Sequence, residues 1–134
     1  MPDIEKALKD PHLVVRCLSA LAFRSMTARA VAPILPSVIS SQQDKDANVR
    51  LVSADVIARQ EKNGISALPA LIVPAQVPGE EVHVLRSLAA AMGAIGPGAS
   101  AAVPMLRQLD MQPRVRWAAE AAIRHITGEP AGPK

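Results

Sequence analysis

The sequence predicts an all-α protein in which about four antiparallel helix pairs are stacked in chain order. An acidic residue stands six positions before an arginine four times, and the intervals between these arginines are 34, 36 and 30 residues. Apolar residues recur at helical spacing, and no stretch alternates at period two as a half-buried strand would. A repeat of this period is typical of an array of small helical units. The four repeated pairs are Asp10/Arg16, Asp44/Arg50, Glu80/Arg86 and Asp110/Arg116.

A proline motif divides the second, third and fourth units into two helices each. It lies 17 to 19 residues after an arginine and occupies residues 32–35, 68–71 and 103–106. Proline is tolerated near a helix start, where the first N–H groups have no partner within the helix. One helix of each unit therefore begins near the acid and carries the arginine, and the other begins near the proline.

These signals predict eight helices, in the order in which the units follow one another. Pro74 and Pro78 predict that the fifth helix ends early and that a longer connection follows it. The first helix has no proline motif, so either it is a polar cap or the chain is a fragment of a longer array. The expected helices span residues 3–9, 12–25, 28–42, 46–62, 65–73, 80–95, 99–109 and 112–127.

The predicted helices have broad apolar faces, as expected for helices that pack on two neighbours. In the first arginine-bearing helix this face comprises Val14, Cys17, Leu18, Leu21 and Ala22. In the third it comprises Val84, Leu85, Leu88, Ala91, Met92 and Ile95. We expect one repeat domain over residues 1–127, with units near 3–25, 28–62, 65–95 and 99–127. Residues 128–134 are rich in glycine and proline and should form a flexible tail.

The composition limits the classes of function. The 134 residues include one Phe, one Trp and no Tyr, although 49% are hydrophobic. Two rings make poor stacking platforms for single-stranded nucleic acid and poor walls for a small-molecule pocket. The net charge is +3 without a Lys/Arg cluster, which argues against nucleic acid and lipid surfaces as partners. Cys17 is single, and no signal peptide or membrane-length apolar run is visible, so a cytoplasmic location is expected.

The repeat resembles that of HEAT-repeat proteins, and is most similar to the subclass called phycobilisome-lyase HEAT-like repeats. The resemblance rests on the acid–x5–arginine spacing, the aliphatic residue before each arginine, and the alanine-rich helix and proline motif that follow, over about residues 4–127. It implies a right-handed superhelix of helix pairs whose arginine-bearing helices line the concave surface. The subclass is named after enzymes that attach bilins to antenna proteins, but most members are not lyases.

The four repeat arginines, Arg16, Arg50, Arg86 and Arg116, have two interpretations. They form either a row of cations that binds phosphates or carboxylates of a partner, or a structural row that satisfies acids and carbonyls between adjacent repeats. The constant acid favours the structural interpretation, because a site built for anions would not supply its own. The acid also stands near a helix start, where a carboxylate can accept N–H groups.

Charged residues that the repeat does not demand are better candidates for binding a partner. On the arginine-bearing helices these are Arg24, Asp55, Arg59, Glu120, Arg124 and His125. Trp117 is either a partner anchor or a bulky end residue, since tryptophan is enriched in binding hot spots. We select Arg24, Arg59, Trp117, Arg124 and His125 as the candidate partner-binding residues.

The leading hypothesis is a non-catalytic protein-interaction scaffold that needs no cofactor or metal and whose protein partner is unidentified. The three histidines lie in different units, and no catalytic motif or phosphate-binding loop is present. One alternative is an enzyme of the bilin-lyase type or its subunit. Another is a nucleic-acid-binding HEAT-like module.

Overall fold

The computed structural model describes residues 2–129 and is all-helical, with no strand in that range, which confirms the predicted class. The longer helices are α2 (Leu13–Arg24), α5 (Ala47–Ala58), α7 (Val82–Ile95) and α9 (Arg116–Thr127). The shorter ones are α1 (Pro2–Ala7), α3 (Ala28–Val31), α4 (Leu35–Ser40), α6 (Leu68–Ala75) and α8 (Val103–Leu109). Four 3₁₀ segments connect them: η1 (Ala32–Ile34), η2 (Ser41–Gln43), η3 (Glu61–Ala67) and η4 (Gly96–Ala102).

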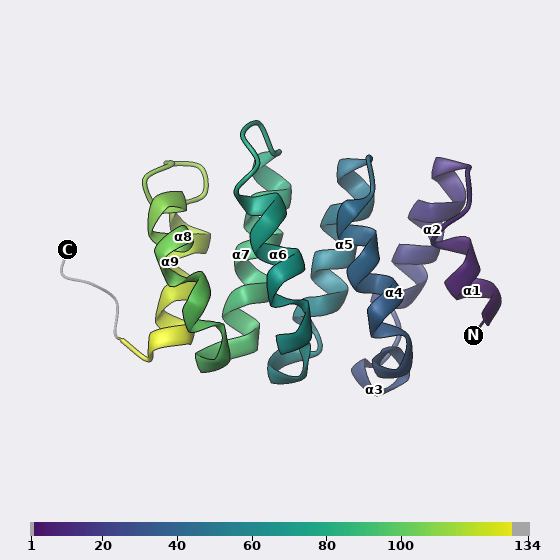
Figure 1. The fold of residues 1–134 in the computed structure, drawn as a ribbon, viewed down its shortest axis with the longest axis horizontal. Coiled ribbons are helices and arrows are strands. Elements are labelled where there is room, and N and C mark those ends of the chain that lie inside the picture. The colour runs from purple at the N-terminus through teal and green to yellow at the C-terminus, as the bar shows by residue number, and fades with distance from the viewer. Residues whose placement is uncertain (1, 130–134) are drawn as a thin grey trace.

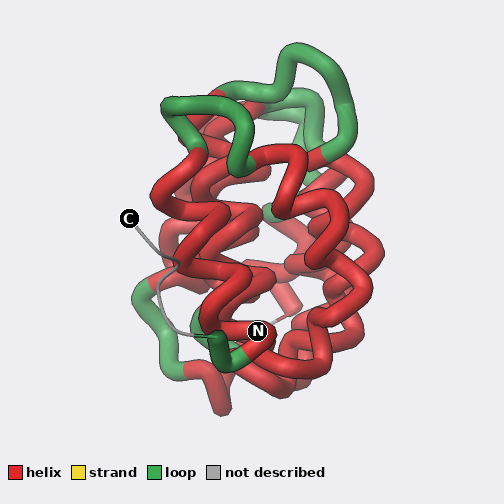
Figure 2. Tube along the Cα trace, turned by 90° about the vertical axis from the view of Figure 1, so that its left-hand side faces the viewer, coloured by secondary structure: helices red, strands yellow, loops and turns green. Residues whose placement is uncertain are grey.

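The helices form two layers that follow the chain (Figure 1). Helices α2, α5, α7 and α9 carry the repeat arginines, and each packs against the next one in this order. Helices α1, α4, α6 and α8 form the other layer, and each packs against the following arginine-bearing helix. Seen from the end of the array, the connecting loops lie at the two ends of the helices (Figure 2). Among residues 2–129, the second layer covers one face of the arginine-bearing layer, and no helix packs on the other face.

Prolines set where the helices of the second layer begin. Pro69 and Pro104 lie in the first turn of α6 and α8, as the sequence predicts. The expected helix at 28–42 is divided into α3, η1, α4 and η2 because Pro33 and Pro36 remove two N–H donors within one turn of each other. Tight 3₁₀ turns at these points keep the chain direction with fewer α-helical hydrogen bonds.

Helix boundaries differ from the prediction at several points: α5 ends at Ala58 rather than at 62, and α6 and α8 begin at Leu68 and Val103 rather than at 65 and 99, whereas α9 ends at Thr127 as expected. Helix α6 continues through Pro74 to Ala75, two residues beyond the expected end, because the carbonyls before Pro74 still accept bonds from later N–H groups. The last helix begins at Arg116 rather than at 112, since residues 112–115 form a turn. Gly128, with φ of 73°, ends α9 in the left-handed region. Most of the predicted tail, residues 130–134, lies outside the described residues.

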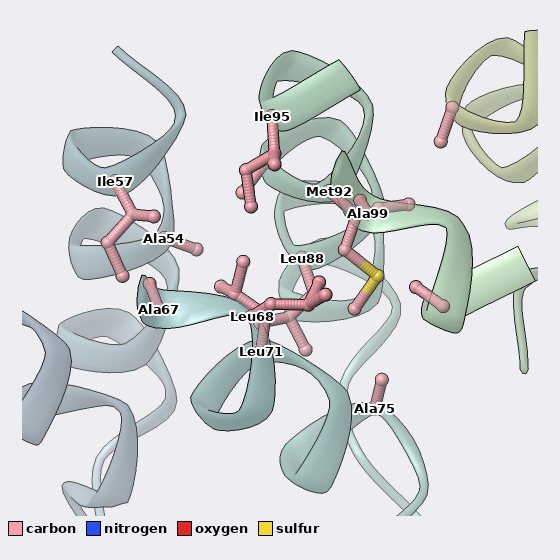
Figure 3. Packing of buried hydrophobic residues seen from close by; sticks show 14 of the residues in the cluster. Ala54, Ile57, Ala67, Leu68, Leu71, Ala75, Leu88, Met92, Ile95 and Ala99 are labelled. Atoms are coloured by element: carbon pink, nitrogen blue, oxygen red, sulfur yellow. The ribbon is translucent and has the colours of Figure 1, made fainter. Parts of the chain in front are cut away.

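The core consists of small and aliphatic side chains between the two layers. Leu71, Leu88 and Met92 are fully buried at its centre, where α6 meets α7 (Figure 3). Helices α7 and α9 lie so close together that a Cβ at Gly93 would be 3.0 Å from the Cα of Ala122. Alanine and glycine at such positions let helix backbones come near each other, which fits the low aromatic content.

The predicted apolar face of the first arginine-bearing helix is exposed in part, contrary to expectation. Val14 and Leu18 are 68% and 61% exposed, and Leu21 is also exposed. We call these three residues the α2 outer face. They point away from α5, and α2 instead buries Arg16, Ser19, Ala20 and Phe23 against it. Sequence periodicity located an apolar face on α2 but did not show that no helix among residues 2–129 covers it.

The stretch Val82–Leu109 is long and apolar enough to span a membrane by length and composition, which the sequence expectation overlooked. The most apolar window within it is 50% buried inside the protein. The stretch is also not one continuous α-helix, because Gly96 has φ of 82° and η4 separates α7 from α8.

Candidate functional site

The first three repeat arginines contact the unit that follows their own, and the first two do so through ion pairs. The Nε of Arg16 lies 2.8 Å from Oδ2 of Asp44, and both side chains are less than a tenth exposed. The Nη2 of Arg50 lies 2.8 Å from Oε1 of Glu80. In both cases the carboxylate belongs to the unit after that of the arginine, and not to the acid six residues earlier.

The acid six residues earlier contributes its backbone carbonyl. Arg16 donates to the carbonyl of Asp10 at 3.0 Å, and Arg50 donates to that of Asp44 at 2.7 Å. Arg116 donates to the carbonyl of Asp110 at 3.1 Å, and its side chain is 3.9 Å from an Asp110 carboxylate oxygen. The fixed spacing of six residues therefore brings each of these guanidinium groups to the turn that precedes its own helix.

The acids close turns before the helices rather than capping the helices themselves. An Oδ1 of Asp10 accepts the N–H of His12 at 2.8 Å, and Asp44 accepts that of Asp46 at 2.9 Å. The cap of α5 is Asp46, which accepts the N–H groups of Asn48 and Val49. Helix-start capping by the repeat acid, expected from the sequence, is thus shifted by two residues in α5, and α2, α7 and α9 have no side-chain cap.

The third junction departs from the other two. Arg86 donates to the carbonyl of Arg114 at 2.9 Å, and no ion pair joins it to Asp110 among the described residues. The interval between arginines is also shortest here, at 30 residues. A shorter unit places a carbonyl where the longer units place a carboxylate, so Arg86 remains more exposed than Arg16 or Arg50.

Burial and pairing act on Glu80 in opposite directions. Burial alone would raise its pKa, but hydrogen bonds from Arg50 and from the Glu81 N–H, with the Arg50 charge, together lower the pKa below its ordinary value. A carboxyl group whose pKa is lowered by folding stabilises the fold at pH values above its unfolded-state pKa of about 4.3. This stabilisation is lost as the pH falls through the lower pKa of the folded state.

We expect Glu80→Gln to flatten the acid side of the stability profile. In urea titrations between about pH 7 and pH 3, the native chain should lose stability faster than the variant below about pH 4.5, because only the native chain must protonate Glu80. Glu120→Gln, on the exposed side of α9, is the matched control and should follow the native curve. Parallel native and Glu80→Gln curves would contradict the assignment.

A groove on the arginine-bearing layer is the strongest candidate for a binding site. It crosses from α5 over α7 to α9 and encloses about 430 Å³. Trp117 on α9 forms one wall and is 79% exposed. The floor consists of small residues, and charged or polar groups stand at the rim. The floor residues are Ala90, Gly93, Ala94, Ala118, Ala121 and Ala122, and the rim residues are Asp55, Arg86, Ser87 and His125. We call this the Trp117 groove.

In comparisons with known proteins, no family model, curated protein or solved structure matches the chain. The candidate site therefore rests on its own geometry.

The predicted partner-binding residues divide into three places. Trp117 and His125 line the Trp117 groove. Arg24 and Arg59 lie beside each other next to it, since Arg59 donates to the carbonyl of Arg24. Arg124 does not line the groove and is half-buried on α9.

Asp55 connects the groove with Arg24. Its carboxylate lines the groove and lies 3.8 Å from Nη1 of Arg24. Burial raises its pKa above the ordinary value, although a hydrogen bond with Ser87 and the charge of Arg24 oppose the effect. Sequence reasoning noted Asp55 as an off-pattern charge but did not select it.

The floor of the groove was missed from the sequence. From the sequence alone, alanines and a glycine at these positions do not differ from the ordinary residues of an alanine-rich helix. The available signal was their spacing: Ala90, Gly93 and Ala94 lie four, seven and eight residues after Arg86, on one face of α7. Small residues at successive turns let α9 approach α7 closely and leave a shallow channel beside the junction.

A second cavity of about 650 Å³ lies between η2 and α6, in the other layer. Its wall includes Val73 and Val77, which are exposed, together with Pro69, Pro74 and Pro78. The Arg50–Glu80 pair closes one end. These charged groups are already paired with each other, so the cavity offers mainly apolar contact.

Cys17 is half-buried, and burial raises the pKa of its thiol, with nearby Asp46 and Asp44 adding to the effect. A thiol of raised pKa is a weak nucleophile at neutral pH. His12 is bound to Asp10 at 3.0 Å in the turn before α2. Within residues 2–129, no three His, Cys, Asp or Glu residues gather as metal ligands would.

Proposed function

We propose that the protein is a non-catalytic protein-interaction scaffold with the architecture of a right-handed HEAT-like solenoid. Support comes from the stacking of helix pairs in chain order and from the repeated arginines, which are used between units. The partner is a protein that docks on the arginine-bearing layer. On this proposal the repeat residues Asp10, Arg16, Asp44, Arg50, Glu80, Arg86, Asp110 and Arg116 maintain the array, and residues outside the repeat pattern bind.

The single observation that carries the proposal is the exposure of Trp117 beside a floor of small residues. A tryptophan that is 79% exposed is a large apolar surface in contact with water. Covering such a side chain contributes to binding more than covering most other residues, and tryptophan is enriched in hot spots. A floor of alanine and glycine lets a partner's backbone or side chain approach the helices closely.

The rim indicates the chemistry of the partner segment. Arg86 supplies a cation, Asp55 an anion, and Ser87 and His125 hydrogen-bonding groups. A partner segment that fits would place an apolar side chain against Trp117 and carry both charge signs around it. Complementary charges at a rim favour orientation and specificity more than affinity.

We expect Trp117→Ala to abolish or strongly reduce binding of the partner, by at least about 2 kcal/mol, the loss typical of a hot-spot residue. Met111→Ala is the matched control, because Met111 is also 79% exposed but does not line the groove. Proteins that co-purify with the native chain and with Met111→Ala, but not with Trp117→Ala, identify the partner. Retention of every partner by Trp117→Ala would disprove the location of the site.

Intrinsic fluorescence offers a direct measurement because Trp117 is the only tryptophan and there is no tyrosine. Once a partner is in hand, binding at the groove should shift the Trp117 emission to shorter wavelength as the ring leaves water. A partner that binds without changing this emission binds elsewhere.

A further inference from the structure

Arg86 differs from the two repeat arginines before it in what its guanidinium group contacts. In Arg16 and Arg50, Nε donates to one carboxylate oxygen of the following unit, at 2.8 and 3.0 Å. Their Nη2 groups donate to the second oxygen of the same carboxylate, at 3.4 and 2.8 Å. In Arg86, Nε donates to the backbone carbonyl of Arg114 instead, and neither Nη group has a partner among the described residues. This junction therefore keeps the cation of the repeat but does not supply the carboxylate.

The acid of the fourth unit does not take that place. Asp110 lies 3.9 Å from Nε of Arg116, the arginine of its own unit, and no ion pair joins it to Arg86 within residues 2–129. Both the interval of 30 residues and the turn before α9 separate this junction from the first two. The donors of Arg86 are consequently available to a group from outside the chain.

Arg86 stands beside the aromatic wall of the Trp117 groove. It lies in the second turn of α7, and Trp117 lies in the first turn of α9, the helix that packs against α7. Both side chains are exposed, and both line the groove. A ligand in the groove can thus contact the indole ring and the guanidinium group together.

The other fully charged residue of the groove already has its counter-ion. Asp55 on α5 lies 3.8 Å from Nη1 of Arg24 on α2. Arg24 therefore offsets the negative charge of Asp55, and Arg86 is left as the charged residue of the groove without an ion pair in the described part of the chain. The charge that complements the groove is negative.

We propose that Arg86 binds the carboxylate of an aspartate or glutamate side chain of the partner, which completes the third junction as Asp44 and Glu80 complete the first two. This inference rests on the proposed function, since it names the chemistry that the Trp117 groove recognises. A planar guanidinium group donates two parallel hydrogen bonds to a carboxylate, and the pairs of Arg16 and Arg50 show that geometry in this fold. The partner segment is an acidic peptide with an apolar residue close to the acid, which covers Trp117.

The first test selects ligands from a synthetic library of peptides that are blocked at both ends and contain no Trp or Tyr. The library is presented to the native chain and to Trp117→Ala. We expect the peptides that bind only the native chain to be enriched in Asp or Glu close to an apolar residue. Trp117-dependent peptides without this enrichment overturn the inference but leave the groove as the binding site. If no peptide depends on Trp117, the groove itself is the wrong site and both proposals fail.

The second test asks whether Arg86 and the peptide acid contact each other. Trp117 emission measures the dissociation constant of a selected peptide and of its counterpart with Gln in place of the acid. Either Arg86→Gln or the peptide change should raise the dissociation constant about tenfold, and both together no further than either alone. Arg107→Gln is the matched control and should have no effect, because Arg107 is an exposed arginine of α8 outside the groove.

This double-mutant cycle separates a contact with the acid from a structural role of Arg86. If Arg86→Gln only loosened α9 through loss of the bond to the Arg114 carbonyl, it would weaken the acidic peptide and its Gln counterpart equally. That result overturns the inference. A phosphoserine peptide that binds more tightly than both, while the acidic and Gln peptides bind equally, overturns it as well and assigns the site to phosphate.

Discussion

Replacing Arg16 with methionine is expected to destabilise the protein by about 3 kcal/mol, a large share of the total stability of a domain of this size. The reason is the buried carboxylate that remains. Asp44 is paired with Arg16 at 2.8 Å, and its side chain is only 9% exposed. Without Arg16 this charge stays in a region of low polarity with one backbone N–H as its partner. The carbonyls of Asp10 and Pro11 lose donors as well.

The measurement is urea unfolding of native and variant proteins at neutral pH, followed by circular dichroism. Arg24→Met serves as the control, because Arg24 also faces an acid of the next unit, Asp55, but at 3.8 Å and at the surface. An exposed pair of this kind contributes about 0–1 kcal/mol. If the two variants lost equal stability, the buried Arg16–Asp44 link would not be what joins the first two units.

The repeat predicted the class of the fold well because its signals are local. Acid, arginine and proline recur at nearly fixed distances, and each proline of the motif lies near a helix start. The partner of each arginine could not be found in this way. The acid six residues earlier is nearest in sequence, but its side chain turns to the following N–H, and the carboxylate that Arg16 meets is 28 residues away. Contacts between units depend on how the units stack.

The candidate site was predicted only in part for a similar reason. Trp117 and His125 were found because they break the repeat pattern, and the structure places both in one groove. Arg124 breaks the pattern equally but lies outside that groove. Which side of α9 faces α7 is decided by packing at Gly93 and Ala122, and a list of unusual residues does not contain this information. The floor of small residues is visible only once α7 and α9 are side by side.

Replacing Gly93 with valine is expected to separate the last unit from the array at a cost of about 3 kcal/mol. A Cβ at this position would lie 3.0 Å from the Cα of Ala122 and 3.3 Å from its Cβ. Backbone atoms cannot rotate away, so α7 and α9 must move apart, and valine adds two further methyl groups. In a stacked array each unit contacts only its neighbours, so weakening one junction uncouples the units on either side.

Two probes distinguish this outcome from general destabilisation. Trp117 fluorescence reports α9, and circular dichroism reports all helices. We expect the fluorescence transition of Gly93→Val to occur at lower urea than the circular dichroism transition, whereas the two coincide in the native chain. Gly98→Ala is the control, because its one crowded contact would be with the flexible Cδ1 of Ile65, at 2.7 Å, and the other neighbours lie at ordinary contact distance. Coincident transitions in Gly93→Val would show that this junction is not a separable element.

The same variant connects stability with the proposed function. Gly93 belongs to the floor of the Trp117 groove, and the wall, Trp117, stands on the helix that would move. Gly93→Val should therefore weaken partner binding as much as Trp117→Ala does, although Trp117 itself is unchanged. Gly93→Ala should be intermediate in both measurements, because the gain of about 1 kcal/mol in helix propensity offsets part of the crowding. Partner binding that survives in Gly93→Val would mean that Trp117 acts alone and that the groove between α7 and α9 is not the binding site.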